Sequence, residues 1–229
     1  MVFLRREFMQ VLYDALPDRE SRVLTGKKVV GVEQDDSCAT VSCADGSVFK
    51  GDMVVGCDGV RSAVRRFGLE GAESEKKNQK KRTRSPFKAE YQGLFGYGPR
   101  LDGVPPCDLT EVHDKDVSFM VLSTHDVSFW LVTHLKENRD TGSSSSAEGG
   151  EKKHKYSAED AQALADRYAD HPVAWGGKVT FGDLWRTRSP ANSGLYDLME
   201  GVADRWYHGR VVTIGDSAHE VRPANHVLV

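Results

Sequence analysis

Gly51-Asp-Met-Val-Val-Gly-Cys-Asp-Gly-Val-Arg-Ser-Ala-Val-Arg65 is the stretch of sequence that decides the fold. Its apolar run, 53–57, predicts a buried strand, and Asp58-Gly59 predicts a tight turn after it because glycine tolerates a positive φ. Ser62 and Arg65 then fall on the next helical turn. Such a strand, turn and helix bring backbone N–H groups to one point, which suits a phosphate or a ribose. A plain turn that binds nothing is the alternative for this stretch alone.

A second stretch has the same plan. Arg210-Val-Val-Thr-Ile-Gly-Asp-Ser-Ala-His219 again predicts a buried strand that ends in Gly-Asp, and Pro223 follows. We therefore expect Asp58 and Asp216 to lie on the same face of one sheet.

Together, the two stretches resemble the paired motifs of the FAD-dependent monooxygenases, the single-component aromatic hydroxylase and epoxidase family. The resemblance looks closest to the fungal secondary-metabolism branch. The first family motif, D-G-x-x-S-x-x-R, and the second, G-D-[AS]-[AV]-H-x-x-x-P, match without a gap. The matching positions are Asp58, Gly59, Ser62 and Arg65, and then Gly215, Asp216, Ser217, Ala218, His219 and Pro223.

The resemblance implies an α/β fold with two domains. A truncated FAD/NAD(P)-binding, Rossmann-like domain would comprise residues 1–67 and 205–229. An antiparallel-sheet substrate domain would be inserted at 87–190, and 68–86 would link the two.

The resemblance also implies a chemistry. NAD(P)H reduces FAD, and reduced FAD uses dioxygen to hydroxylate or epoxidise a small organic substrate. The cofactor carries the reaction, so no catalytic side chain and no metal are expected.

The cofactor-binding residues that it implies are Arg5, Asp58, Gly59, Ser62, Arg65, Gly215, Asp216, His219 and Pro223. Asp216 would accept a hydrogen bond from a ribityl hydroxyl, and Asp58 and Gly59 would lie near the pyrophosphate and the route of the nicotinamide. His219 and Pro223 would lie close to the flavin ring. A solvated arginine at a helix start is the alternative for Arg5, and a histidine without a chemical role is the alternative for His219.

Two expected patterns are missing from the sequence. The family opens with a G-x-G-x-x-G turn that holds the FAD pyrophosphate, and it continues beyond the proline into a G-Q-G turn; neither pattern occurs here. We therefore expect a flavoenzyme sequence that is incomplete at both ends and binds FAD weakly or not at all. A catalytically inactive remnant is the alternative.

Composition is that of a globular chain. The 229 residues are 39% hydrophobic, with a net charge of -3 at pH 7. Apolar runs are far shorter than the roughly 20 residues of a membrane span, so we expect no transmembrane segment. Four cysteines without C-x-x-C spacing favour a reducing compartment and hence the cytoplasm, although membrane association through other segments stays open. We expect Cys38 and Cys43 to lie on one strand and to face opposite sides of it.

A short basic run raises a third possibility, an interaction module for nucleic acid or another acidic partner. The run lacks aromatic residues for base stacking and is better explained as a solvated connection, so no nucleic-acid partner is expected. A second flexible connection is expected at 140–155. The basic residues are Lys76, Lys77, Lys80, Lys81, Arg82 and Arg84.

Periodicity predicts the remaining elements. They are a helix at 6–16, a hairpin turning at Asp45-Gly46, strands at 87–97, 108–113, 117–123 and 127–135 in an antiparallel sheet, a helix capped by Ser157 with Ala161, Leu164, Ala165 and Tyr168 on its buried face, and a last strand at 206–214. Aromatic residues of the sheet are candidates for lining a substrate pocket, with plain core as the alternative. They are Tyr91, Phe95, Phe119, Phe129 and Trp130.

Overall fold

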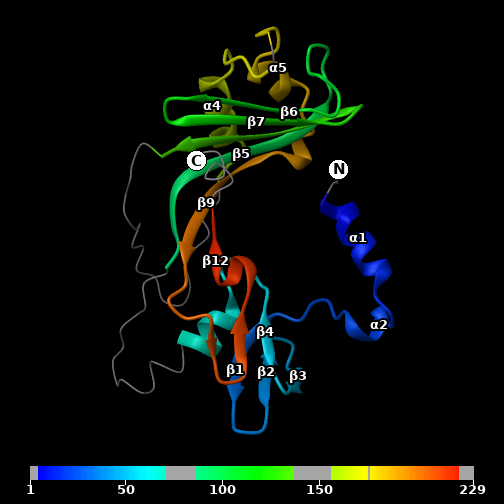
Figure 1. Ribbon diagram of the computed structural model, residues 1–229, viewed down its shortest axis with the longest axis vertical. Coiled ribbons are helices and arrows are strands. Elements are labelled where there is room, and N and C mark those ends of the chain that lie inside the picture. Colours follow the sequence, from blue (N-terminus) through cyan, green and yellow to red (C-terminus); the bar gives the residue numbers. More distant parts are fainter. Residues whose placement is uncertain (1–4, 71–85, 137–155, 175, 222–229) are drawn as a thin grey trace. The chain divides into compact units, whose positions relative to one another are not determined.

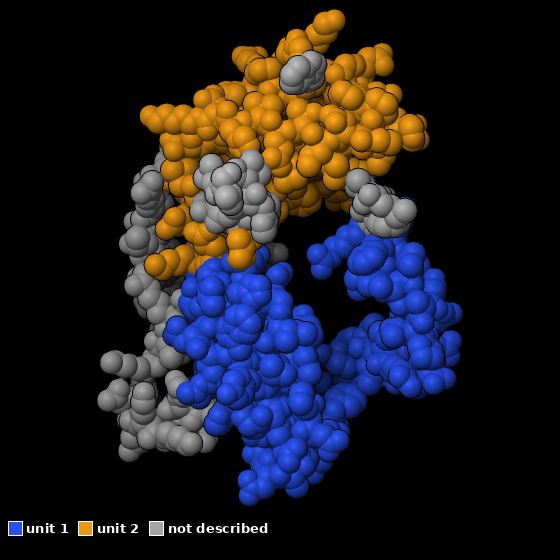
Figure 2. Space-filling view, viewed as in Figure 1, with its two compact units in different colours: residues 1–87, 201–220 blue, residues 88–200, 221–229 orange. Residues whose placement is uncertain are grey.

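The structure is a computed structural model that describes residues 5–70, 86–136, 156–174 and 176–221. The chain divides into two compact units (Figure 1, Figure 2). Unit 1 comprises Met1–Phe87 and Gly201–Glu220, and unit 2 comprises Lys88–Glu200 and Val221–Val229. The basic run at 76–84 and the connection expected at 140–155 lie outside the described residues.

Unit 1 contains a three-stranded antiparallel sheet. Its strands are β1 (Val29–Gln34), β2 (Ala39–Cys43) and β3 (Val48–Gly51). The hairpin predicted at Asp45-Gly46 is confirmed, and Gly46 has a φ of 82° that other residues rarely adopt. The Asp45 carboxylate accepts hydrogen bonds from the backbone N–H (3.1 Å) and Oγ (2.6 Å) of Ser47, which closes the turn.

The cysteines are not arranged as expected. Cys38 precedes β2 and does not share it with Cys43, so the prediction that both lie on one strand is wrong. The reason is local, because the Asp35 carboxylate accepts a 2.8 Å hydrogen bond from the Cys38 N–H and holds that residue in a turn. All four cysteines of the sequence have free thiols.

A second small sheet of unit 1 contains both strand-end motifs. Its strands, in spatial order, are β10 (Tyr207–His208), β11 (Val211–Thr213) and β4 (Val54–Gly56). β4 and β11 are parallel, whereas β10 and β11 form an antiparallel hairpin. The single strand predicted at 206–214 is therefore wrong, because the chain turns at Gly209, which has a φ of 55°.

The burial of β4 also differs from the prediction. Met53 and Val55 are 62% and 49% exposed, so the strand expected to be buried has one open side. Val54 packs against the core of the unit, whereas the next residue of the strand, Val55, points to the opposite face. That core is a small cluster of Val32, Val64, Leu69 and Val211.

Two helices begin the described part of unit 1 (Figure 1). They are α1 (Arg5–Ala15) and α2 (Arg19–Arg22). The first confirms the helix predicted at 6–16, although none of its residues is buried. A short π-helical segment, η1 (Arg65–Glu70), follows β4 and covers part of the core. Among the described residues, no helix has the length and apolar character needed to span a bilayer.

Unit 2 is built on an antiparallel sheet, as predicted. In spatial order its strands are β9 (Gly194–Val202), β5 (Lys88–Pro99), β8 (Val127–Leu135), β7 (Val117–Ser123) and β6 (Leu109–Asp114). The sequence prediction missed β9, whose Asp197, Glu200 and two glycines are unfavourable in strands. The last residues of β9 belong to unit 1, where they pair with β12 (His219–Glu220).

Helices cover one face of this sheet (Figure 1). They are α4 (Ala158–Arg167) and α5 (Phe181–Arg186), and the short η2 (Pro190–Asn192) follows. The cap predicted at Ser157 is confirmed as a capping box with Asp160, and Thr180 and Asp183 form a second one. The buried stripe predicted for the first helix is confirmed at Ala161, Leu164, Ala165 and Tyr168, which join the largest core of the chain.

Candidate cofactor site

Two turns follow the carboxyl ends of the neighbouring parallel strands β4 and β11. β4 leads into Asp58-Gly59, and β11 leads into Gly215-Asp216, which opens the short 3-10 helix η3 (Gly215–Ser217). The Ile214 N–H donates a 3.0 Å hydrogen bond to the Gly56 carbonyl, so the pairing continues to the start of the turns. The strands that lead to the two aspartates are thus neighbours in one sheet, and the expectation that the aspartates share a face of it stays a prediction.

Glycine is required in each turn by the backbone. Gly59 has a φ of 79° and Gly215 a φ of 59°. A Cβ atom at either position would meet no atom within 4 Å. The space beside both glycines is therefore open in the described structure, and a ligand can approach the main chain there.

Both carboxylate oxygens of Asp58 accept hydrogen bonds from other residues of the chain. One carboxylate oxygen accepts hydrogen bonds from Ser62 Oγ (2.5 Å) and Ser217 Oγ (3.2 Å). The other oxygen accepts from the backbone N–H groups of Ala63 (2.6 Å) and Val64 (3.1 Å). Partial desolvation raises the pKa of Asp58, but these hydrogen bonds outweigh it and leave the pKa below its ordinary value. The N–H groups of Ala63 and Val64 at this helix start are therefore already bound within the chain, and the expectation that the turn suits a phosphate or a ribose stays a prediction.

Two buried serines connect the turns. Ser217, which is fully buried, accepts a 2.9 Å hydrogen bond from the Gly59 N–H and contacts the Asp58 carboxylate. Ser62, also buried, accepts a 2.9 Å hydrogen bond from the Arg65 N–H while its hydroxyl donates to Asp58. Sequence reasoning did not single out Ser217 as a site residue. Its place in the second motif was a signal, but its contact with the first turn required the structure.

Arg65 also lies inside the chain and not at its surface. Its Nη1 donates to the Ser217 carbonyl and its Nη2 to the Val60 carbonyl, each at 2.6 Å. The side chain of Arg65 is thus a second link between the turns.

Asp216 has different surroundings. The residue is exposed, and its carboxylate has no hydrogen-bond partner in the described part of the chain. Glu220, which sequence reasoning missed, lies close enough to feel its charge. Burial raises the pKa of Glu220, and the negative charge of Asp216 raises it further. Glu220 Oε2 is itself buried without a hydrogen-bond partner among the described residues.

His219 lies just after the second turn. It is exposed, and its ring stacks on Trp206 with a centroid distance of 5.2 Å and an interplanar angle of 19°. The Trp206 Nε1–H donates a 3.1 Å hydrogen bond to the Ala203 carbonyl, which fixes the indole. Trp206 was not predicted as a neighbour of the site, because only the β10–β11 hairpin brings it there.

Two other predicted residues are not brought to these turns. Arg5 is exposed at the start of α1, and none of its described contacts connects it to either turn. Pro223 lies outside the described residues. The roles of both residues remain predictions.

The side-chain chemistry of the second turn suits hydroxyl groups. The exposed Asp216 carboxylate is an acceptor for hydroxyl groups and repels an anion, and the helix-start N–H groups already bind Asp58. The open main chain at Gly59 and Gly215 lets a sugar-like chain lie close. The second turn therefore presents an acceptor for the hydroxyl groups of a polyol, which is the chemistry of the ribityl portion of a flavin.

On unit 2, the aromatic candidates divide between two faces of the sheet. Phe119 and Trp130 are buried in the core under α4 and α5. Tyr91, Phe95 and Phe129 lie on the opposite face, where Phe95 is 40% exposed. For Phe119 and Trp130 the alternative, plain core, is what the structure shows, since neighbours such as Phe129 and Trp130 must point to opposite sides of a strand.

The face opposite the helices is apolar and partly open. No described helix of unit 2 covers it, and its strands place aromatic and aliphatic side chains opposite one another. Its ring contacts include Phe95 with Tyr196, at a centroid distance of 5.2 Å. The half-buried or exposed residues that define this open face are Tyr91, Phe95, Met120, Phe129, Leu131 and Tyr196.

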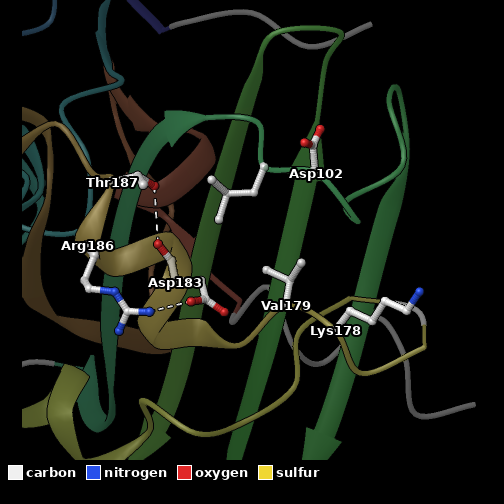
Figure 3. Close-up of a pocket in the computed structure, with 7 residues that line it drawn as sticks. Asp102, Lys178, Val179, Asp183, Arg186 and Thr187 are labelled. Carbon is white, nitrogen blue, oxygen red and sulfur yellow. Dashed lines mark hydrogen bonds and ion pairs between the residues drawn. The ribbon is translucent and has the colours of Figure 1, made fainter.

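A pocket of about 300 Å³ lies elsewhere on unit 2, beside α5 (Figure 3). Its acidic residue Asp183 caps α5 and pairs with Arg186, while the Lys178 side chain extends away from both. The charges of Asp183 and Arg186 are thus already paired within the helix. Its lining residues are Leu101, Asp102, Lys178, Val179, Asp183, Arg186 and Thr187.

Comparison with solved structures supports the fold. Klebsiella pneumoniae HpxO, complexed with FAD and uric acid, superposes on 96% of this chain with a TM-score of 0.66 and 20% identity, over 49% of its own length. The 2,6-dihydroxypyridine-3-hydroxylase of Arthrobacter nicotinovorans superposes on 91% with a TM-score of 0.62 and 20% identity, over 52% of its length. At this identity the likeness concerns the fold alone.

Comparison of sequences gives a nearer relationship. No model of a known protein family matches the chain. The FAD-dependent monooxygenase esdpE of Penicillium shearii is 34% identical over 96% of the chain, and dpchE of Colletotrichum higginsianum is 36% identical over 95%. The chain spans only 43% and 45% of these two enzymes. By sequence, the chain is a relative of the fungal FAD-dependent monooxygenases over a region that makes up somewhat less than half of their length.

Proposed function

We propose that this chain supplies the ribityl end of an FAD site in a monooxygenase. The observation that carries the proposal is the exposed Asp216 carboxylate, held where two parallel strands end and next to two glycines with open main chain. An aspartate in this position accepts a hydrogen bond from a ribityl hydroxyl without competition from other partners. The sequence relationship to enzymes named FAD-dependent monooxygenases supports the same reading.

The cofactor, when bound, would supply electron transfer from NAD(P)H and insertion of one oxygen atom from dioxygen into a small organic substrate. The chain's own residues bind and orient it. Asp216 would fix the ribityl chain, and Gly59 would lie along the route of the nicotinamide. His219, supported by the Trp206 indole, would lie beside the flavin ring. Arg5 and Pro223 stay in the proposal as further cofactor contacts.

The two units would have different roles, one in cofactor binding and one in substrate binding. Unit 1 corresponds to the partial FAD-binding domain, and unit 2 to a substrate domain inserted between its two segments. The open face of unit 2 would receive the substrate, because aromatic side chains such as Phe95 and Phe129 favour flat, apolar molecules.

A chimera tests the function. The segments of the Penicillium shearii enzyme that lie outside the matched region would be joined to this chain, and the purified protein examined for flavin absorbance and for NAD(P)H and dioxygen consumption. We expect stoichiometric FAD in the chimera and weak or no binding to the 229-residue chain alone. A folded chimera without flavin would favour the alternative, an inactive remnant.

A second experiment tests the substrate face. Phe129→Ala in the chimera should weaken substrate-stimulated NAD(P)H oxidation while FAD stays bound. Val48→Ala is a matched control, since that side chain is exposed on β3 in unit 1. Equal substrate responses in Phe129→Ala and the parent would remove this part of the proposal.

A further inference from the structure

The guanidinium of Arg65 is buried within the chain, although the sequence motif alone predicts that it contacts a ligand. The residue is 7% exposed. Its two terminal nitrogens donate to the carbonyls of Val60, in the first turn, and Ser217, in the second, each at 2.6 Å. Its Nε lies 3.4 Å from a carboxylate oxygen of Glu70. The guanidinium therefore has a partner in each of the two turns.

The rest of its surroundings are also protein. The guanidinium carbon stands 4.7 Å from the centre of the Phe87 ring, a cation–π contact with a buried side chain. Gly201 packs against the backbone of Pro86 and Phe87 so closely that a Cβ at Gly201 would lie 2.3 Å from the Pro86 carbonyl oxygen. Residues of unit 1 thus surround Arg65, and little space is left for a ligand at its charged end.

Only arginine suits this position. A buried cation is costly unless several partners compensate it, and the planar guanidinium can address two carbonyls, a carboxylate and a ring at once. A lysine has a single nitrogen and lacks the planar fork with which the guanidinium donates to both carbonyls.

We propose that Arg65 is a positioning residue that holds the Gly215–Ser217 turn against the Asp58-Gly59 turn and does not touch the ligand. It acts through Ser217, whose carbonyl it binds and whose hydroxyl accepts the Gly59 N–H. Asp216 precedes Ser217 in the chain, so fixing this carbonyl also fixes where the Asp216 carboxylate can point. The relevance to a cofactor rests on the proposed function, whereas the link between the turns does not.

Hydrogen exchange on the 229-residue chain tests the link directly. In Arg65→Lys, exchange of the Gly59 amide should become about tenfold faster or more, the effect of losing one hydrogen bond from a charged donor. Amides of β1 and β2 should keep their protection, which a general loss of stability would not allow. Arg66→Met is the control, because Arg66 is exposed and contacts the neighbouring Phe67 ring. It should leave the Gly59 amide unchanged.

Unchanged exchange at Gly59 in a folded Arg65→Lys chain would overturn the proposal. If this variant does not fold, the wild-type chain still decides the matter through nitrogen-15 NMR of arginine side chains. Arg65 should show slowly exchanging guanidinium protons and Arg66 fast ones. Equally fast exchange at both would overturn the proposal as well.

Flavin titration of the chimera separates positioning from direct contact. If Arg65 positions the turns, Arg65→Lys should lower FAD affinity about tenfold and accelerate Gly59 exchange together. Loss of affinity with normal exchange would mean a direct ligand contact and would contradict the proposal. A parent chimera that binds no FAD would defeat the proposed function, while the exchange result would still decide the link between the turns.

Discussion

The two strand-end turns share a sequence pattern but differ in what their aspartates do. Asp58 accepts four hydrogen bonds from its own chain, two of them from a helix start and one from the second turn. Asp216 is exposed, and its carboxylate accepts none among the described residues. An aspartate beside a glycine at a strand end can therefore either stabilise the turns of a site through hydrogen bonds within the chain or face the ligand.

The difference follows from the order of the two residues. In Asp58-Gly59 the aspartate precedes the glycine, so its carboxylate reaches forward to Ala63 and Val64 at the helix start. In Gly215-Asp216 the glycine comes first and the aspartate lies within η3, where its side chain is turned to solvent. Four predictions follow from this contrast.

Asp58→Ala should have the largest effect on stability. The change leaves two helix-start N–H groups and two serine hydroxyls without their acceptor, and hydrogen bonds to a charged group are worth about 1.5–3 kcal/mol. We expect a loss of that size in the free energy of unfolding, measured by urea denaturation. Since hydrogen bonding lowers the pKa of Asp58 below its unfolded value, this stabilisation should be complete above the unfolded pKa and lost as pH falls through the folded one.

Ser217→Ala should have a somewhat smaller effect. It removes the acceptor of the Gly59 N–H and one donor to Asp58 from a fully buried position. We expect a loss of about 1–2 kcal/mol in the free energy of unfolding. A double-mutant cycle with Asp58→Ala should show coupling between the two changes, and strict additivity would mean that the turns are not linked through these side chains.

Glu220→Gln should be stabilising at neutral pH by about 0.2–1 kcal/mol. The pKa of Glu220 is raised in the folded chain, so its favourable contribution is complete below the unfolded pKa and is lost as pH rises through the folded pKa. The difference in free energy of unfolding between Glu220→Gln and the parent should therefore grow from acid to neutral pH. Asp216→Asn should reduce the pH dependence of the parent, because the Asp216 charge contributes to the shift.

Asp216→Ala should have the smallest effect on stability. Its exposed side chain has no hydrogen bond to lose, so the free energy of unfolding should change by less than about 0.5 kcal/mol. Thermal unfolding of this variant beside Asp58→Ala measures the contrast. If Asp216→Ala lowers the free energy of unfolding as much as Asp58→Ala does, both aspartates stabilise the turns and the contrast between them is wrong.

Much of the fold could be predicted from local patterns. The hairpin at Asp45-Gly46, the four strands between 87 and 135, and the helix capped by Ser157 each follow from a turn signal, an alternation or a cap. β9 could not be predicted in the same way, because pairing with β5 and not local propensity makes it a strand. The turn at Gly209 was missed because the aromatic and β-branched residues before and after it predicted one continuous strand.

For the site, the sequence predicted which turns matter but not how their side chains are used. The motif residues Asp58, Ser62 and Arg65 were all expected to bind a cofactor, yet their partners lie largely within the chain. Several of those partners are close in sequence, but Ser217 lies 152 residues from Arg65 and 159 residues from Asp58. Only the parallel pairing of β4 with β11 brings them together, and residue spacing cannot encode it.

Flavin titration of the chimera and its variants tests the central claim most directly. A charge-assisted hydrogen bond from a ribityl hydroxyl is worth roughly 1.5–3 kcal/mol, so Asp216→Ala should bind FAD about tenfold to a hundredfold more weakly while its free energy of unfolding stays that of the parent. Ser62→Ala should lose less affinity, because its hydroxyl supports the turn. If Asp216→Ala binds FAD as tightly as the parent does, Asp216 does not face the cofactor and the distinction between the two turns fails.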